Sequence, residues 1–267
     1  MTDPSHDPQA DANNPFNHPL NPEYGSGVYR RKIRLVNRPG RVEAALEDCH
    51  HGFCVTIAHD GQHVTAVSPE HRRIPLTTCA GAARPLRALV GTPLGLDDKA
   101  LARVVDASAN CTHWLDLSLL AIAQAGRDEA VREYLVNVPD DDGSAVAAEV
   151  WCNGRLVHRW MLHDWTIQAP RAMAGKPLYR GFVKWASDLF TDADKREAAF
   201  ILQKGYFVSS ARRFDVPALA GDPASGHTVM HGSCYTYSEP QVAHAVRIGA
   251  ASVRDFSECP EQLLQFK

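Results

Sequence analysis

A carboxylate and two imidazoles lie within four residues in the run Asp48-Cys49-His50-His51, and a third imidazole, His113, follows in a later segment. Histidine changes protonation near neutral pH and is a common metal ligand. A carboxylate beside an imidazole fixes its tautomer and stabilises its protonated form, so the pair makes an oriented general base. We therefore expect an acid–base site in which Asp48 orients His51 as the base and His113 or a tyrosine is the acid.

The same side chains allow a second interpretation, a metal site. Asp48, His51 and His113, together with Cys79 or Cys111, carry donor atoms that suit zinc or iron. No His-x-x-x-His, His-x-Glu or Cys-x-x-Cys spacing places two of them on one element. We expect no metal and no organic cofactor, and keep the zinc or iron site as the alternative. In a third interpretation, the ring N–H groups of His51 and His59 bond to backbone carbonyls at the rim of a sheet.

Three further side chains could assist such a site. The planar fork of Arg73 suits a carboxylate or phenolate as an anion anchor, although a structural salt bridge is the alternative. Tyr235 and Tyr237 lie in a polar and aromatic run after a loop rich in Gly and Pro. They could form the rim of a pocket, in which Tyr235 would donate a proton and Tyr237 would contact substrate.

A second acid–base candidate depends on the turn Asn153-Gly154, which is typical of a two-residue type I′ hairpin. That turn sets Glu149 opposite His158 across two strands, with tryptophans on either side. An exposed cross-strand pair is the alternative, and His163-Asp164 offers another such pair. The side chains that we expect to bind substrate are His59, Trp114, Glu149, Trp151, His158, Trp160 and Tyr237.

The elements that position these residues follow from hydrophobic periodicity. Alternation predicts strands from Tyr29 onward, and Asp60-Gly61 predicts a hairpin that pairs Ile57 with Val64. The buried face would carry Phe53, Val55, Ile57, Val64 and Ala66, with His51 and His59 extending it. The basic run Arg30-Arg31-Lys32 with Arg34 is interpreted as the solvated face of a strand.

Helices are predicted over 79–90, 98–125, 178–190 and 192–204, and a short strand over 206–208. Strands and helices occur in separate runs, which favours an α+β fold with antiparallel sheets covered by helices. We expect an extended arm over 1–28, rich in Pro and Asn, then lobes over 29–138 and 144–267 packed as one globular unit. The arm could clasp a second copy in a homodimer.

Composition and motif content argue against several classes of function. The formal net charge of −3 and the lack of a long basic run argue against nucleic-acid binding. No apolar stretch is long enough for a membrane span, and seven scattered cysteines do not form a disulfide framework. We expect a cytoplasmic protein. The motifs for dinucleotides, for phosphate loops and for a serine nucleophile are absent from the sequence.

Several short runs carry a resemblance to a known family. They are Ala45 to His51, Arg73-Ile-Pro with Thr78-Cys79, Leu89-Val-Gly91, and Asn110-Cys-Thr-His-Trp-Leu-Asp116. Over about residues 29–125 the chain resembles the bacterial family called domain of unknown function 2889. That family usually has Gly-Cys-Thr-His-Leu in the last run, so Asn110 and Trp114 depart from it. The resemblance implies that Asp48, His51, Arg73, Cys79, Cys111 and His113 form one recurring group, and it implies no activity.

Taken together, the sequence predicts a catabolic enzyme that acts on a hydrophobic, aromatic small molecule. General acid–base chemistry without a cofactor would make it a lyase that cleaves a C–C or C–O bond. One alternative is a metal-binding accessory or scaffold protein, or a metal-dependent hydrolase. Another is a non-catalytic assembly module held by its N-terminal arm.

Overall fold

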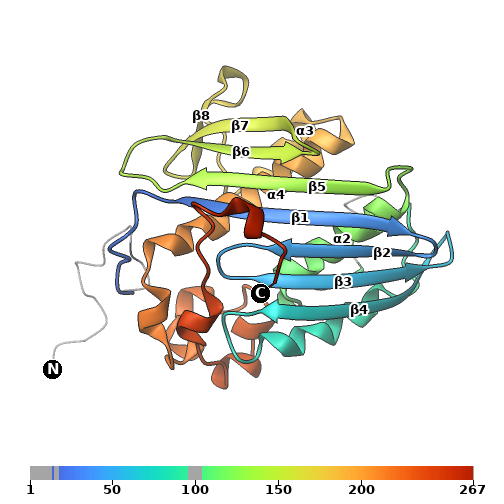
Figure 1. Ribbon diagram of the computed structural model, residues 1–267, viewed down its shortest axis with the longest axis horizontal. Helices are drawn as coiled ribbons and strands as arrows, with labels where there is room; N and C mark the ends of the chain where they lie inside the picture. The colour runs from blue at the N-terminus through green and yellow to red at the C-terminus, as the bar shows by residue number, and fades with distance from the viewer. Residues whose placement is uncertain (1–13, 15–17, 96–103, 267) are drawn as a thin grey trace.

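The computed structural model describes residues 14, 18–95 and 104–266, and its central element is one eight-stranded antiparallel sheet (Figure 1). The strand order is β4-β3-β2-β1-β5-β6-β7-β8. The strands are β1 Val28–Arg38, β2 Arg41–Glu47, β3 Gly52–His59, β4 Val64–Arg73, β5 Val131–Pro139, β6 Val146–Cys152, β7 Arg155–His163 and β8 Thr166–Ala169. The predicted α+β class with antiparallel strands is confirmed.

The two predicted lobes are parts of this one sheet. Strands β1 and β5 pair along their length, from Val28 opposite Pro139 to Val36 opposite Val131. Residues 29–138 supply β1 to β5 and residues 144–267 supply β6 to β8, so hydrogen bonding between strands continues across the predicted boundary.

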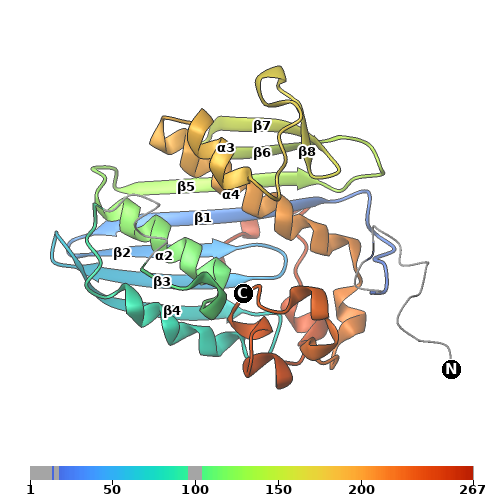
Figure 2. The same cartoon turned by 180° about the vertical axis from the view of Figure 1, so that it is seen from behind.

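Within the described residues, the α-helices that cover one face of the sheet are α2 Thr112–Ala125, α3 Phe182–Leu189 and α4 Ala193–Ser209 (Figure 2). Helix α2 lies over β2 and β3, and α4 lies over β5 and β6. The main core fills the space between sheet and helices, where Trp114, Trp160 and Ile57 are at most 1% exposed. None of the described helices combines the length and the apolarity that crossing a membrane requires.

Several predicted helices differ from the observed ones. The predicted helix over 79–90 is two 3₁₀ helices, Cys79–Ala83 and Pro85–Leu89, because Pro85 cannot continue the first. The predicted helix over 98–125 begins only at Thr112, after a 3₁₀ turn at 107–109, and residues 96–103 lie outside the described part. The short strand over 206–208 is wrong, because these residues complete α4.

The Asp60-Gly61 hairpin has a wider loop than predicted. The Asp60 carboxylate accepts the amides of Gln62 and His63 at 2.8 and 2.7 Å, which organises a longer turn. His59 therefore lies opposite Val64, and Ile57 lies opposite Val67. Phe53, Val55, Ile57 and Val64 are buried as predicted, whereas Ala66 is exposed.

The described part of the N-terminal arm contacts its own chain. Leu20 forms a β-bridge with Phe214, and the Tyr24 hydroxyl donates to Asp141 at 3.1 Å. Most of the predicted arm over 1–28, including Phe16, lies outside the described residues. Exchange of the arm within a homodimer stays a prediction.

Candidate acid–base site

The turn between β2 and β3 is organised by the side chain of Asp48. Its Oδ1 atom accepts the backbone amides of His50 and His51, each at 2.9 Å, and the Nδ1 of His51 lies 3.0 Å from the same oxygen. The amide of Asp48 donates to the carbonyl of His51 at 2.9 Å, which closes the turn. Aspartate favours such turns because its carboxylate reaches amides two and three residues ahead. The same contacts that shape the turn therefore aim the ring of His51.

The second oxygen of Asp48 faces two buried partners on β1. Its Oδ2 atom accepts from the Tyr29 hydroxyl at 3.0 Å and from Arg31 at 3.0 and 2.6 Å. Asp48 and Tyr29 are fully buried and Arg31 is 2% exposed. Burial alone would raise the pKa of the Asp48 carboxyl, but His51 and Arg31 outweigh it and hold that pKa well below its ordinary value. Asp48 is therefore an anion at any pH near neutrality.

The charge of Asp48 decides the tautomer of His51. An ionised carboxylate has no proton to donate, so the short contact requires a proton on Nδ1 of His51. The Nε2 atom then carries the lone pair when the ring is neutral. The side chain of His51 keeps 12% of its surface exposed. His51 thus combines a partly exposed ring with a fixed anion beside its Nδ1 atom.

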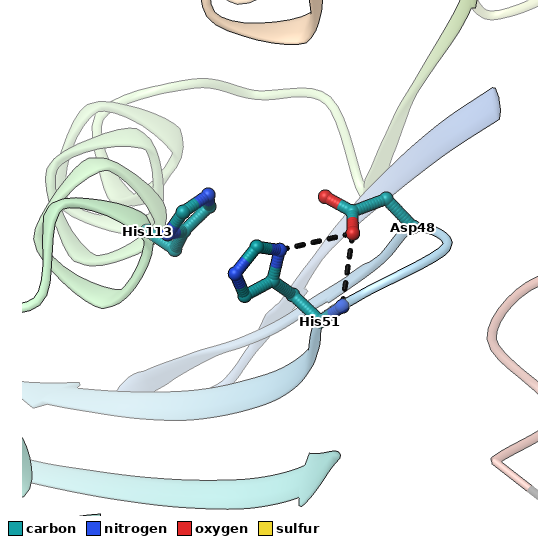
Figure 3. A group of neighbouring side chains, drawn as sticks. All are labelled: Asp48, His51 and His113. Atoms are coloured by element: carbon teal, nitrogen blue, oxygen red, sulfur yellow. Dashed lines mark hydrogen bonds and ion pairs between the residues drawn. The ribbon is translucent and has the colours of Figure 1, made fainter. Parts of the chain in front are cut away.

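The ring of His113 stacks on that of His51, with centroids 3.8 Å apart and planes at 24° (Figure 3). The ring of Phe53 lies 5.8 Å from His51 and 6.1 Å from His113 and adds an apolar wall. Burial lowers the pKa of His113 well below its ordinary value, and His51 and Arg31 lower it further. The buried Nε2 atom of His113 has no hydrogen-bond partner within the described chain. The ring of His113 is therefore neutral. It stacks on His51, and its Nε2 atom has no hydrogen-bond partner in the described chain.

A groove of about 360 Å³ runs between α2, α3, α4 and the sheet. Its walls are mostly apolar, and its charged lining residues are Arg31, Asp116, Glu197 and Lys204. Arg31 is also the partner of Asp48, and both Arg31 and Lys204 lower the pKa of His113. His51 and His113 are not among the lining residues of the groove, and Arg31 links the groove to Asp48.

His113 and several residues that line the groove lie on the same face of helix α2. Residues three, four and seven places apart share one helix face. Asp116, Leu117 and Leu120, which line the groove, stand at these spacings from His113.

Arg73 lies beside the turn, but it forms the salt bridge that the sequence left as the alternative. One of its terminal nitrogens contacts Glu47 at 3.2 Å, the carbonyl of His51 at 3.2 Å and the carbonyl of Asp48. Arg73 therefore holds the backbone of the turn instead of presenting this nitrogen to a substrate anion.

The two cysteines of the metal alternative lie outside the group. Among the described residues, the only metal-binding cluster found is Asp48, His51 and His113, whose ligand atoms lie within 4.8 Å of one another. The Cys79 sulfur accepts from Thr236 at 3.3 Å in a separate cluster with Leu76 and Tyr237. Burial raises the pKa of Cys79 to about 11 and that of Cys111 to about 12, so both remain thiols.

The tyrosines, Trp114 and His59 were expected to assist the site, but each of them has contacts elsewhere in the structure. The Tyr237 hydroxyl accepts from Arg247 at 3.3 Å, and Tyr235 packs against Gly81. In the described structure no contact joins either tyrosine to the histidine pair. Trp114 is 1% exposed and donates to the carbonyl of Cys54 at 3.1 Å, so it is a core residue. His59 accepts from the Gly61 amide at the opposite end of β3.

The predicted pair of Glu149 and His158 is wrong. The Asn153-Gly154 turn forms as predicted, with φ of 48° and 76°, but an irregularity after Val150 shifts the register by one residue. His158 therefore lies opposite Val150. Because neighbouring side chains on a strand point to opposite faces, this one-residue shift places His158 and Glu149 on opposite faces of the sheet.

The residues of this hairpin have structural contacts instead. The ring of His158 contacts the carbonyl of Lys195 at 2.7 Å, and Trp160 is fully buried in the core. The Trp151 indole donates to Glu149 at 3.0 Å. His163 and Asp164 form an exposed pair at 3.3 Å.

Sequence reasoning missed Tyr29 and Arg31. The basic run is predicted as a solvated face, yet Arg31 is buried. The available signal was the alternation of Tyr29, Arg31, Ile33 and Leu35, which places all four on one face of β1.

Neither the scan against protein-family models nor the search of curated proteins returned a match for this chain. The resemblance to domain of unknown function 2889 therefore stays a prediction, and a proposal of function depends on the geometry of the site.

Proposed function

We propose that this protein is an enzyme that uses His51 as a general base, oriented by Asp48, on a small apolar molecule bound in the groove between the helices. One observation supports this proposal above the others. The fully buried Asp48, whose carboxyl pKa is held well below its ordinary value, lies 3.0 Å from Nδ1 of His51, and the ring of His51 stacks at 3.8 Å on that of His113. A carboxylate–imidazole pair in a partly dry setting is the arrangement that general-base catalysis requires.

The proposed reaction is a lyase reaction on an aromatic substrate. His51 Nε2 takes a proton from the substrate, and Asp48 balances the positive charge that develops on the ring. The electron pair left behind forms a double bond as the neighbouring C–C or C–O bond breaks. The same proton then passes from His51 to the leaving group, which restores the base. The Nε2 atom of His113 hydrogen-bonds to a polar group of the substrate.

The groove supports an aromatic substrate by its size and its lining. About 360 Å³ lies within the usual range for small-molecule sites. Its walls include Phe182, Phe200 and Tyr179, whose rings offer both apolar area and preferred stacking geometry.

The experiment detects proton abstraction whatever product the reaction forms. The full chain is incubated in D₂O with a panel of aromatic metabolites, and mass spectrometry detects both deuterium uptake and new products. We expect His51→Ala to lower the rate by about 10²- to 10⁴-fold, while His59→Ala, a matched change at the far end of β3, leaves it unchanged. Equal rates in His51→Ala and His59→Ala would remove His51 as the base.

A metal centre is the second candidate, because Asp48, His51 and His113 bring ligand atoms within 4.8 Å. Asp48 fits this role poorly. Each of its oxygens already accepts three hydrogen bonds, and Arg31 neutralises its charge. A carboxylate has about four lone-pair positions, so no acceptor site is left for a cation. Elemental analysis of protein purified without an affinity tag distinguishes the two candidates, since stoichiometric zinc or iron would favour the metal centre.

A further inference from the structure

The turn that carries Asp48 and His51 is covered from outside by the C-terminal segment Arg254–Phe266. In Figure 1 this segment crosses the sheet on the face opposite the helices. The backbone amide of Arg254 donates to the carbonyl of Cys49 at 2.8 Å, inside the turn itself. Its guanidinium lies over the ring of Phe256, 4.7 Å from the centroid, which fixes the direction of the side chain.

Glu47 connects the segment to the turn. It is 1% exposed and immediately precedes Asp48. Its Oε1 atom accepts from Arg254 at 2.9 Å and from Arg73 at 3.2 Å, and its Oε2 atom accepts the amide of Leu264 at 2.6 Å. A buried carboxylate is stable only when such partners compensate its lost hydration. Glu47 therefore keeps its buried position only while the C-terminal segment is docked.

Arg73 extends the same network to His51. The nitrogen that contacts Glu47 also contacts the carbonyls of Asp48 and His51. At the start of β3, an added Cβ on Gly52 would lie 3.3 Å from both Phe266 and the backbone nitrogen of Arg73. The C-terminal segment thus contacts the turn at both of its ends.

We propose that Glu47 and Arg254 are positioning residues for the acid–base pair. With Arg73, they hold the 48–51 turn in the shape in which Asp48 fixes the Nδ1-protonated tautomer of His51. This inference rests on the proposed function, because positioning matters for catalysis only if His51 is the base. The docked segment acts on Asp48 and His51 from the side opposite to the groove, and so without touching a substrate.

The test uses Arg254→Gln, which removes the charge that pairs with Glu47, and Arg254→Lys as the conservative variant. A chain truncated after Glu261 removes the contacts of Leu264 and Phe266 while leaving Arg254 in place. Arg41→Gln is the matched control, since Arg41 pairs with Glu43 on the same strand β2 at 3.0 Å and is 49% exposed.

Two measurements report on the turn without requiring a substrate. Hydrogen exchange gives the protection of the amides of His50 and His51, which donate to Asp48. Diethylpyrocarbonate acylates an unprotonated imidazole nitrogen, and site-resolved mass spectrometry gives the rate at His51 as a function of pH. We expect Arg254→Gln and the truncation each to lower amide protection roughly tenfold and to shift the pH profile of acylation, with partial recovery in Arg254→Lys.

Faster hydrogen exchange at residues 254–264 would show that the segment is released in Arg254→Gln. The inference is overturned if, in that variant, the acylation profile of His51 and the amide protection of His50 and His51 still match those of Arg41→Gln. If Arg254→Gln does not fold, Arg254→Lys and the truncated chain decide in the same way. Loss of the proposed function has a different signature, namely normal turnover in His51→Ala.

Discussion

Replacing Asp48 by asparagine tests the site more severely than any other single change. The substitution removes the anion that Arg31 contacts at 2.6 Å, at a position where both side chains are at most 2% exposed. The asparagine NH₂ group would also face donors, because each Asp48 oxygen accepts three hydrogen bonds. Breaking a buried ion pair by removing one partner costs about 3–5 kcal/mol. For a chain of this size that corresponds to a fall in Tm of roughly 6–20 °C.

The assay is thermal and urea unfolding of Asp48→Asn, with Asp116→Asn as the matched control. Asp116 pairs with Lys204 at 3.0 Å, but the side chains are 41% and 31% exposed. We expect the control to cost less than about 1 kcal/mol.

Adding Arg31→Met to Asp48→Asn removes the stranded cation. The costs of the two single changes should then exceed that of the double variant by about 1–3 kcal/mol. A cost below about 1 kcal/mol for Asp48→Asn, or strict additivity of the two changes, would refute the assignment of Asp48 as a buried anion paired with Arg31.

Four other outcomes follow from the same structure. Burial lowers the pKa of His50 to about 4, whereas an unfolded histidine has a pKa of about 6.5. The unfolded state therefore binds protons first, and the urea midpoint should fall as the pH drops from about 6.5 to 4; a midpoint independent of pH in that range contradicts this. His113→Phe keeps the stack and removes a buried nitrogen without a partner, so we expect unchanged or higher stability, by up to about 2 kcal/mol, together with loss of turnover; a clear fall in Tm would argue against this interpretation of His113. Leu120→Trp should fill the groove and weaken binding of an aromatic probe such as 2-naphthoate in calorimetry, and an unchanged Kd would place the binding site elsewhere. Finally, because the hydrogen bonds to Asp48 leave no acceptor site, chelation with EDTA should leave turnover unchanged, and restoration of a lost activity by zinc or iron would favour the metal centre.

Much of the fold was predictable because the strands follow simple alternation. Phe53, Val55 and Ile57 are buried as the period of two requires, and the Asn153-Gly154 turn forms where its residues favour positive φ. The register was less predictable. The Asp60 side chain organises a loop that is wider than a two-residue turn, and an irregularity after Val150 shifts the register of the other hairpin. Neither feature changes the hydrophobic pattern, so the pattern could not predict them.

The candidate site was predicted in part. The convergence of Asp48, His51 and His113 was expected, because a helix covering the sheet could bring His113 to the strand edge, and the structure places them together. Tyr29 and Arg31, the buried partners of Asp48, were not predicted. Arg31 lies in a run of basic residues, and such a run is typical of a strand face that is exposed to solvent. The contacts of Glu47 with Arg254 and Leu264 join residues more than 200 positions apart, which no local pattern predicts.

The most direct test of the central claim is the ring tautomer of His51 by ¹⁵N NMR at pH 7. We predict a proton on Nδ1, shared in a hydrogen bond with Asp48, and a bare Nε2 when the ring is neutral. A neutral ring that carries its proton on Nε2, or one that exchanges freely between tautomers as in an unrestrained histidine, would contradict this assignment.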